Sequence, residues 1–317
     1  MMKTTKSKKK INVVNVIFIT VLCTILVAYT VSLLYMLFWG LLTSLKSNTD
    51  FLHMKNVLGF PNLEKSREEF LHLANYKLNL EYFEFTKKAI YFSGDKQIIH
   101  KSTSGIFDML IYTVLYAGLG TILHAVATAT VAYLCVKYKH FRLSKIVYTA
   151  NIVCMTLPLV GTAPATIEIL RNLNIFDSFV GMSMMKFSFT GMHFLVLYAF
   201  FEGVSDSYSE AAEIDGASYY RIYFSIMLPL AIKVLSTTML LQFVTLWNDY
   251  QTPLLYLPTY PTLAYGVYYM STVSIGQLSR TPARIAASMM LAIPIFILFI
   301  CLRNKLMGNI SIGGVKE

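Results

Sequence analysis

The sequence predicts an all-α membrane protein that crosses a bilayer six times. Of its 317 residues, 56% are hydrophobic and only 14% are charged, whereas a soluble domain has about 25% charged residues. The charges are clustered, which leaves long uncharged runs at residues 11–45 and 109–136. With a rise of about 1.5 Å per residue, a helix of either run is long enough to cross a hydrocarbon core about 30 Å thick.

Six apolar segments are long enough to be membrane-spanning helices. They cover residues 13–45, 107–136, 146–168, 183–203, 228–250 and 284–303. The third segment contains Pro158 and Pro164 and should be kinked or broken there, because proline removes a backbone donor and clashes with the preceding turn. The fourth begins near Lys186 and the fifth has Lys233 in its first turns. The boundaries of these two helices are therefore expected to differ by several residues from the ranges given above.

Positive charge predicts the orientation of these segments. The basic residues 1–12 precede an apolar run that is longer than the 7–15-residue core of a signal peptide, so we expect this run to stay attached as the first span. If the N-terminus is cytoplasmic, six crossings place residues 304–317 in the cytoplasm as well. The cytoplasmic segments then hold thirteen lysine and arginine residues and the short outer connections only three, which is the asymmetry expected of the positive-inside rule. Both termini are therefore predicted to be cytoplasmic.

Residues 46–104 are predicted to form an extracytoplasmic segment between the first and second spans. This segment has nearly balanced charge and many aromatic residues, which indicates a small folded cap. Within it, residues 63–76 have the composition of an amphipathic surface helix. Partner binding and simple packing over the helix ends are both open interpretations of the segment. The other five spans, within residues 105–303, are expected to form the transmembrane core.

The connection between the fourth and fifth spans has the pattern of two short helices joined at a glycine. Ser207 and Glu210 have the spacing of a capping box, so a helix should begin there with acidic residues in its first turn. Gly216 can adopt the left-handed conformation that ends a helix, and Ser218 can begin the next one. The sequence predicts a cytoplasmic helix-turn-helix elbow within residues 204–227. Local physics alone leaves two interpretations open, a docking element and a plain connector.

The spacing within this elbow resembles a family signature. The pattern Glu-Ala-Ala, three residues, Gly, nine residues, Ile-x-Leu-Pro is similar to the signature of the membrane subunits of bacterial ABC importers. All of its fixed positions are present, namely Glu210, Ala211, Ala212, Gly216, Ile226, Leu228 and Pro229. The resemblance runs from about residue 107 onward and favours the carbohydrate-uptake branch, in particular the smaller permease of maltose importers.

Two further stretches resemble that branch. Residues 247–250, which read Trp-Asn-Asp-Tyr, are similar to a segment at the end of the family's penultimate span. Residues 311–317 resemble its Gly-Ala-Val-Lys-Gly tail, with Gly314 and Glu317 as departures. Residues 46–104 match the family weakly.

The resemblance implies a type I ABC importer permease fold in a bacterial cell membrane. It also implies a set of partners: a second homologous permease, two ATPase subunits and an extracytoplasmic solute-binding protein. The implied cargo is a sugar, and the branch favours an oligosaccharide. The chain has no G-x-x-x-x-G-K-[ST] sequence, so ATP and Mg would bind to the ATPase subunits and this chain would bind no cofactor.

In the family that it resembles, the elbow is a coupling helix that sits in a groove of the ATPase subunit. Here small side chains would permit close approach, and charged groups could form charge-assisted hydrogen bonds at the rim. The residues expected to couple to the ATPase are Glu210, Ala211, Ala212, Glu213, Asp215, Gly216 and Arg221.

Polar groups at membrane depth are costly and often line a transport pathway. The candidates for a translocation pathway are Asn151, Thr156, Trp247, Asn248 and Asp249. Snorkelling to an interface is the alternative for the polar groups. Trp247 could stack on a sugar ring, and an interfacial aromatic belt explains it equally well.

Two other function classes fit the sequence less well. An ion-coupled secondary transporter could use Lys186 or Asp249 as its coupling group, but it would need an inverted repeat that the hydropathy does not show. A membrane-embedded enzyme would need a nucleophile and base or a metal cluster, and the spans hold only isolated polar residues. We therefore predict no catalytic residue and no enzyme activity.

The remaining reactive and charged residues favour neither a metal nor a nucleic acid. The six histidines are scattered, and the cysteines lie far apart in apolar stretches, where we expect buried thiols. The cysteines are Cys23, Cys135, Cys154 and Cys301. The net charge of +10 lies mainly beside the apolar segments, which indicates membrane topology and not a nucleic-acid surface.

Overall fold

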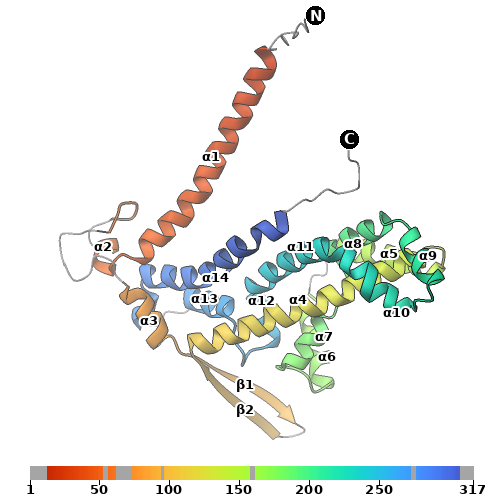
Figure 1. Cartoon of the computed structure of the whole chain (residues 1–317). Helices are drawn as coiled ribbons and strands as arrows, with labels where there is room; N and C mark the ends of the chain where they lie inside the picture. Colours follow the sequence, from red (N-terminus) through yellow and green to blue (C-terminus); the bar gives the residue numbers. More distant parts are fainter. Residues whose placement is uncertain are drawn as a thin grey trace, which may run out of the picture. The chain divides into compact units, whose positions relative to one another are not determined.

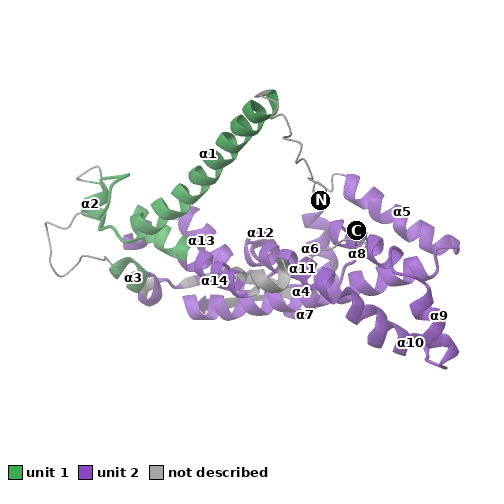
Figure 2. Ribbon diagram, turned by 45° about the horizontal axis from the view of Figure 1, so that its top comes forward, with its two compact units in different colours: residues 1–77, 280–289 green, residues 78–279, 290–317 purple. Residues whose placement is uncertain are grey.

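The computed structural model describes residues 13–52, 56–61, 73–93, 96–157, 161–272 and 276–307 (Figure 1). These residues are mostly helical, as predicted, and they include one two-stranded sheet. The chain divides into two compact units (Figure 2). Unit 1 is residues 1–77 with 280–289, and unit 2 is residues 78–279 with 290–317.

Unit 1 contains the first predicted span, which is helix α1 (Val13–Ser44). Its residues are apolar on every side, and the helix is long enough to cross a membrane. The end of α1 is tied to the start of α3 (Ala74–Tyr82) by side chains: Asn75 Nδ2 donates to the Ser44 and Lys46 carbonyls, at 2.8 Å each. Burial lowers the pKa of Lys46, although the nearby Asp50 carboxylate acts in the opposite direction. The short helix α2 (Asn48–Leu52) lies between α1 and α3 in sequence.

The central element of unit 2 is helix α4 (Ile106–Lys137), which corresponds to the second predicted span. Its buried face carries many small side chains, so neighbouring backbones can approach closely. A Cβ atom added at Gly120 would lie 2.8 Å from Leu246 Cδ1 of α11 (Leu228–Trp247). Helix α4 also packs against α8 (Met192–Glu202).

The third and fourth predicted spans are each two shorter helices. The third is α5 (Arg142–Thr156) followed by α6 (Ala163–Asn172), and the predicted break is confirmed because α5 ends at the extended Leu157, the residue before a proline. The fourth is α7 (Phe179–Lys186) followed by α8, and its break at Gly191 (φ 126°) was not predicted. Among the described residues, four helices are long and apolar enough to cross a membrane.

The C-terminal part of the chain adds several shorter elements before the last long helix. They are α12 (Gln251–Tyr256), α13 (Leu263–Thr272), the 3-10 helix η2 (Gly276–Ser279) and α14 (Thr281–Met307). Helix α14 contains Pro294 and corresponds to the sixth predicted span.

A β-hairpin lies in the segment that was predicted to be a cap. Strands β1 (Phe85–Ser93) and β2 (Lys96–Ser104) pair antiparallel, with Phe85 opposite Ser104 and Ser93 opposite Lys96. Aromatic and β-branched residues in β1 and β-branched residues in β2, separated by a Gly-Asp dipeptide, are a hairpin signal that was not used in the prediction. Most of the amphipathic helix expected at residues 63–76 falls outside the described residues.

The prediction of buried thiols was correct for one cysteine only. Cys135 is buried, whereas Cys23, Cys154 and Cys301 are exposed. The three exposed thiols lie on helix faces that no other described part of the chain covers, and in a membrane such faces meet lipid or another subunit.

Gly181 in α7 offers a test of this packing. A Cβ atom there would collide with the backbone carbonyl oxygen of Ile175, which cannot move aside like a flexible side chain. We expect Gly181→Ala to destabilise the protein by about 1–3 kcal/mol and to lower the apparent melting temperature in detergent. Gly118→Ala is the matched control, since a Cβ atom at Gly118 meets nothing within 4 Å. Equal melting temperatures for the two variants would contradict this packing.

Candidate functional site

The predicted elbow is present and begins one residue earlier than expected. Helix α9 (Ser207–Ile214) has Asp206 as its N-cap, and the Asp206 carbonyl accepts from Glu210 N at 3.0 Å. The predicted capping box at Ser207 is wrong, because the Ser207 hydroxyl instead bonds the Ser205 hydroxyl at 2.8 Å.

The glycine and the second helix of the elbow are as predicted. Gly216 has a φ of 76°, the left-handed region that favours glycine. Ser218 caps α10 (Tyr219–Ile222), and its hydroxyl accepts from Arg221 N at 3.4 Å. The π-helix η1 (Tyr223–Met227) follows and leads directly into α11.

The outer face of the elbow exposes large apolar side chains. Ile214 is 87% exposed and Tyr220 is 80% exposed, although both lie in a connection that also carries many charged residues. Of the predicted coupling residues, the exposed ones are Glu210, Ala211, Glu213, Asp215, Gly216 and Arg221. A cluster of apolar and charged groups at the tip of a hairpin is typical of a protein interaction surface.

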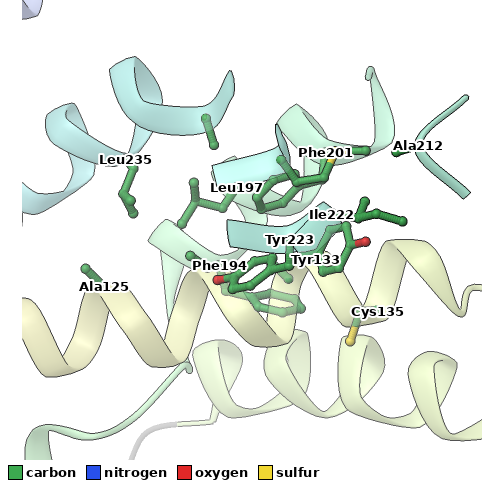
Figure 3. Close-up of a cluster of buried hydrophobic side chains, with 14 residues drawn as sticks. Ala125, Tyr133, Cys135, Phe194, Leu197, Phe201, Ala212, Ile222, Tyr223 and Leu235 are labelled. Carbon is green, nitrogen blue, oxygen red and sulfur yellow. The ribbon is translucent and has the colours of Figure 1, made fainter. Parts of the chain in front are cut away.

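The inner face of the elbow packs on α4 and α8 in one hydrophobic cluster. Ala212, Ile222 and Tyr223 from the elbow belong to this cluster, together with Tyr133 and Phe201 (Figure 3). Small Ala212 is therefore buried against the rest of unit 2. The elbow is consequently a packed part of unit 2 and not a detached loop.

The five pathway candidates differ in exposure and in the hydrogen bonds that they form. Asn151 is 1% exposed, and its Oδ1 accepts from Gly191 N at 2.8 Å, so it supports the break between α7 and α8. Trp247 is 4% exposed, and its Nε1 donates to the Leu291 carbonyl at 3.0 Å. Thr156 and Asn248 are exposed, and each donates to a backbone carbonyl of its own helix.

Asp249, the fifth candidate, is the centre of a polar cluster. Its carboxylate accepts from Tyr116 OH at 2.6 Å, and from the backbone N and Oγ1 of Thr252 at 3.0 and 2.5 Å. Lys186 Nζ lies 3.8 Å from the same carboxylate and 5.4 Å from the centre of the Tyr116 ring. The cluster joins α4, α7 and the start of α12. Because the Lys186 ammonium lies beside the Asp249 carboxylate, their two charges offset each other.

A pair of histidines is among the long-range polar contacts that the sequence did not predict. His193 Nδ1 lies 3.3 Å from His124 Nε2, although the residues are 69 positions apart. The pair lies between α4 and α8, beside Thr121, Thr128, Thr238 and Gln242. Within the described residues, no group of three or more histidine, cysteine, aspartate or glutamate side chains could hold a metal ion.

Comparison with known proteins shows the family of this chain. Residues 125–304, more than half of the chain, match the model of the binding-protein-dependent transport system inner membrane component family. The chain belongs to this family. The family membership that the elbow signature predicted is therefore confirmed.

Several characterised relatives are transport permeases. The chain is 27% identical to the polygalacturonan/rhamnogalacturonan transport system permease YtcP of Bacillus subtilis over 49% of this chain, and the match spans about half (53%) of that relative. It is 25% identical to the sulfoquinovosyl glycerol permease SmoH of Agrobacterium fabrum, over 88% of this chain and 87% of SmoH. It is 26% identical to the maltose/maltodextrin permease MalG of Vibrio vulnificus, over 67% and 73% of the two chains.

A solved structure has the same fold. It is a chain of a bacterial ABC transporter involved in the import of the acidic polysaccharide alginate, with a TM-score of 0.70 and 17% identity. The match covers 95% of this chain and 99% of the other. The predicted type I permease fold is therefore correct.

The Asp249 cluster yields a stability prediction. About a fifth of the Lys186 and Asp249 side chains is exposed. Asp249→Asn therefore leaves Lys186 with a partly buried charge that no partner compensates. We expect this variant to lower the free energy of unfolding by about 1–3 kcal/mol. The double variant Asp249→Asn, Lys186→Met should recover part of this loss.

The measurement for this prediction is the apparent melting temperature of each variant in detergent. Asn248→Ala, which changes the exposed neighbour, is the control. If the double variant melts below the single variant, the two charges do not stabilise each other.

Proposed function

We propose that this chain is a permease subunit of an ATP-driven importer of carbohydrates that depends on a solute-binding protein. The observation that carries the proposal is the elbow, whose inner face is packed on the membrane helices while its outer face exposes Ile214 and Tyr220. Membership of the binding-protein-dependent family supports the same conclusion.

The outer face of the elbow would bind a separate ATPase subunit. Exposed Glu210, Asp215 and Arg221 surround the apolar side chains and can form charge-assisted hydrogen bonds with a partner. The ATPase subunits would bind ATP and Mg. In this arrangement the elbow and both termini lie in the cytoplasm, and the β-hairpin lies outside.

We propose a carbohydrate cargo, with an oligosaccharide as the more specific class. The named relatives support this, because their names refer to polygalacturonan or rhamnogalacturonan, to a sulfoquinovosyl glycerol and to maltose or maltodextrin. A solute-binding protein would deliver the cargo from outside.

One face of α11 is the best candidate for a pathway wall. The exposed side chains of Lys233, Thr245 and Asn248 fall within about 120° of the helix circumference at about 3.6 residues per turn. Polar side chains at membrane depth usually face water or protein and not lipid. We propose that this face and Thr156 border the pathway, and that a second homologous permease supplies the opposite wall.

The geometry favours this function over an ion-coupled transporter. Lys186 and Asp249, the coupling groups that such a transporter would use, bind each other and stabilise the junction between α11 and α12. Neither group is thus available to bind a coupling ion in this conformation.

The elbow is tested by Gly216→Pro. Proline requires a φ near −65° and has no N–H, whereas Gly216 has a φ of 76° and its N donates to the Glu213 carbonyl at 3.0 Å. We expect normal membrane insertion together with at least a tenfold loss of ATPase-subunit co-purification from native membranes. Glu210→Lys places a positive charge near a helix N-terminus, which should weaken docking by about 1 kcal/mol. Co-purification of the ATPase subunit should therefore fall.

Gln277→Ala, an exposed residue outside the elbow, is the control for both variants. Normal co-purification of the ATPase with both elbow variants would refute the docking role.

The orientation is tested by cysteine labelling. Gln277→Cys should react with a membrane-impermeant maleimide in intact cells, and Tyr220→Cys should react only after lysis. The unmodified chain measures the background from its four cysteines. The reverse pattern would refute the proposed topology.

A further inference from the structure

The last residue of α4 is bound to both helices of the elbow. Lys137 Nζ lies 2.7 Å from Glu213 Oε1 of α9, although the residues are 76 positions apart. The same ammonium lies 5.7 Å from the centre of the Tyr219 ring, which belongs to α10. One side chain therefore contacts residues on both sides of the Gly216 turn. We call these three residues, Lys137, Glu213 and Tyr219, the elbow lock.

A second set of contacts fixes the same face of α4 to η1, the part of the elbow that follows α10. Thr130 Oγ1 lies 3.0 Å from Tyr223 OH, and the Tyr133 and Tyr223 rings lie 5.0 Å apart (Figure 3). Thr130, Tyr133 and Lys137 are spaced by three and four residues, so they share one face of the helix. The contacts that Thr130, Tyr133 and Lys137 make to the elbow therefore lie along one stripe of α4.

Glu213 differs from Glu210 and Asp215 because it forms an ion pair within the chain. Its carboxylate already binds Lys137 within the chain, whereas Glu210 and Asp215 are exposed without an ion pair among the described residues. The family signature specifies Glu210 and leaves the position of Glu213 open. Glu213 is thus suited to hold the elbow in place, while Glu210 and Asp215 are available to a partner.

The backbone route from the elbow to α11 passes through η1, a π-helix of five residues. Such segments interrupt the regular hydrogen bonding of an α-helix and often occur at functional sites. The route to α4, in contrast, runs through direct side-chain contacts. Movement of the elbow can therefore reach α4 without passing through the irregular backbone of η1.

We propose that Lys137 and Glu213 are positioning residues that hold the elbow on α4, so that a displacement of the elbow carries the cytoplasmic end of α4 with it. This inference rests on the proposed docking of an ATPase subunit. An isolated, partly exposed ion pair contributes little to stability, so its loss should leave the fold intact and change the transmission of movement.

Hydrogen–deuterium exchange of the complex purified from native membranes tests the lock. The exchange of residues 207–222 and of residues 130–141 is compared without nucleotide and with Mg-ATP plus orthovanadate. In the wild type we expect exchange to change in both regions. In Glu213→Gln and Lys137→Met, the change at 207–222 should remain, whereas the change at 130–141 should fall to less than half.

The charge-exchanged double variant, Lys137→Glu with Glu213→Lys, should restore the response at 130–141. Glu202→Gln, which alters an exposed acidic residue at the end of α8, is the matched control and should behave as the wild type. A response at 130–141 that persists in both single variants, or that is absent from the wild type, overturns the lock.

Co-purification separates this inference from the proposed function. All the variants should retain the ATPase subunit, because they leave Ile214, Tyr220 and the carboxylates of the proposed docking surface unchanged. If the wild type itself brings down no ATPase, the proposed function fails and the lock fails with it. If the ATPase is retained and only the exchange pattern differs from expectation, the lock alone is wrong.

Discussion

The close approach of α4 to α8 and α11 is the contact on which the rest of unit 2 depends. It requires small side chains on the buried face of α4, where Ala125, Ala129 and Ala132 are buried with Gly120. Apolar surface gives little net drive for association between helices in lipid, so packing at short range has to stabilise the arrangement. The broken helices and the elbow can then be held against a rigid central helix.

The polar contacts in unit 2 lie at the places where helices are interrupted. Asn151 satisfies the Gly191 backbone at the break between α7 and α8, and Asp249 binds the Thr252 backbone at the start of α12. Backbone groups at membrane depth have no water to bond, so each interruption needs a side chain as a partner. The breaks in the helices therefore account for the hydrogen bonds of Asn151 and Asp249 to the backbone.

Hydropathy and local motifs predicted the long helices, the break near Leu157 and the elbow glycine, because each depends on residues close together in sequence. The break at Gly191, the hairpin and the long-range polar pairs were missed. Tyr116 and Asp249 are 133 positions apart, and His124 and His193 are 69 apart, so no local spacing could reveal them. The start of α9 was wrong by one residue because the Asp206 carbonyl, and not the Ser207 side chain, accepts its first hydrogen bonds.

The division of the elbow into two faces bears on how a membrane subunit can respond to a partner that stays in water. A flexible hairpin would absorb a displacement, whereas Ala212 and Ile222 are buried and tie the elbow to α4 and α8. The exposed Ile214 is the last residue of α9, and the exposed Tyr220 is the second residue of α10. A force applied to these side chains therefore acts on short helices whose opposite faces are already fixed to the longest helix of unit 2. Rigidity of this kind is what a mechanical connection between a water-soluble subunit and a membrane core requires.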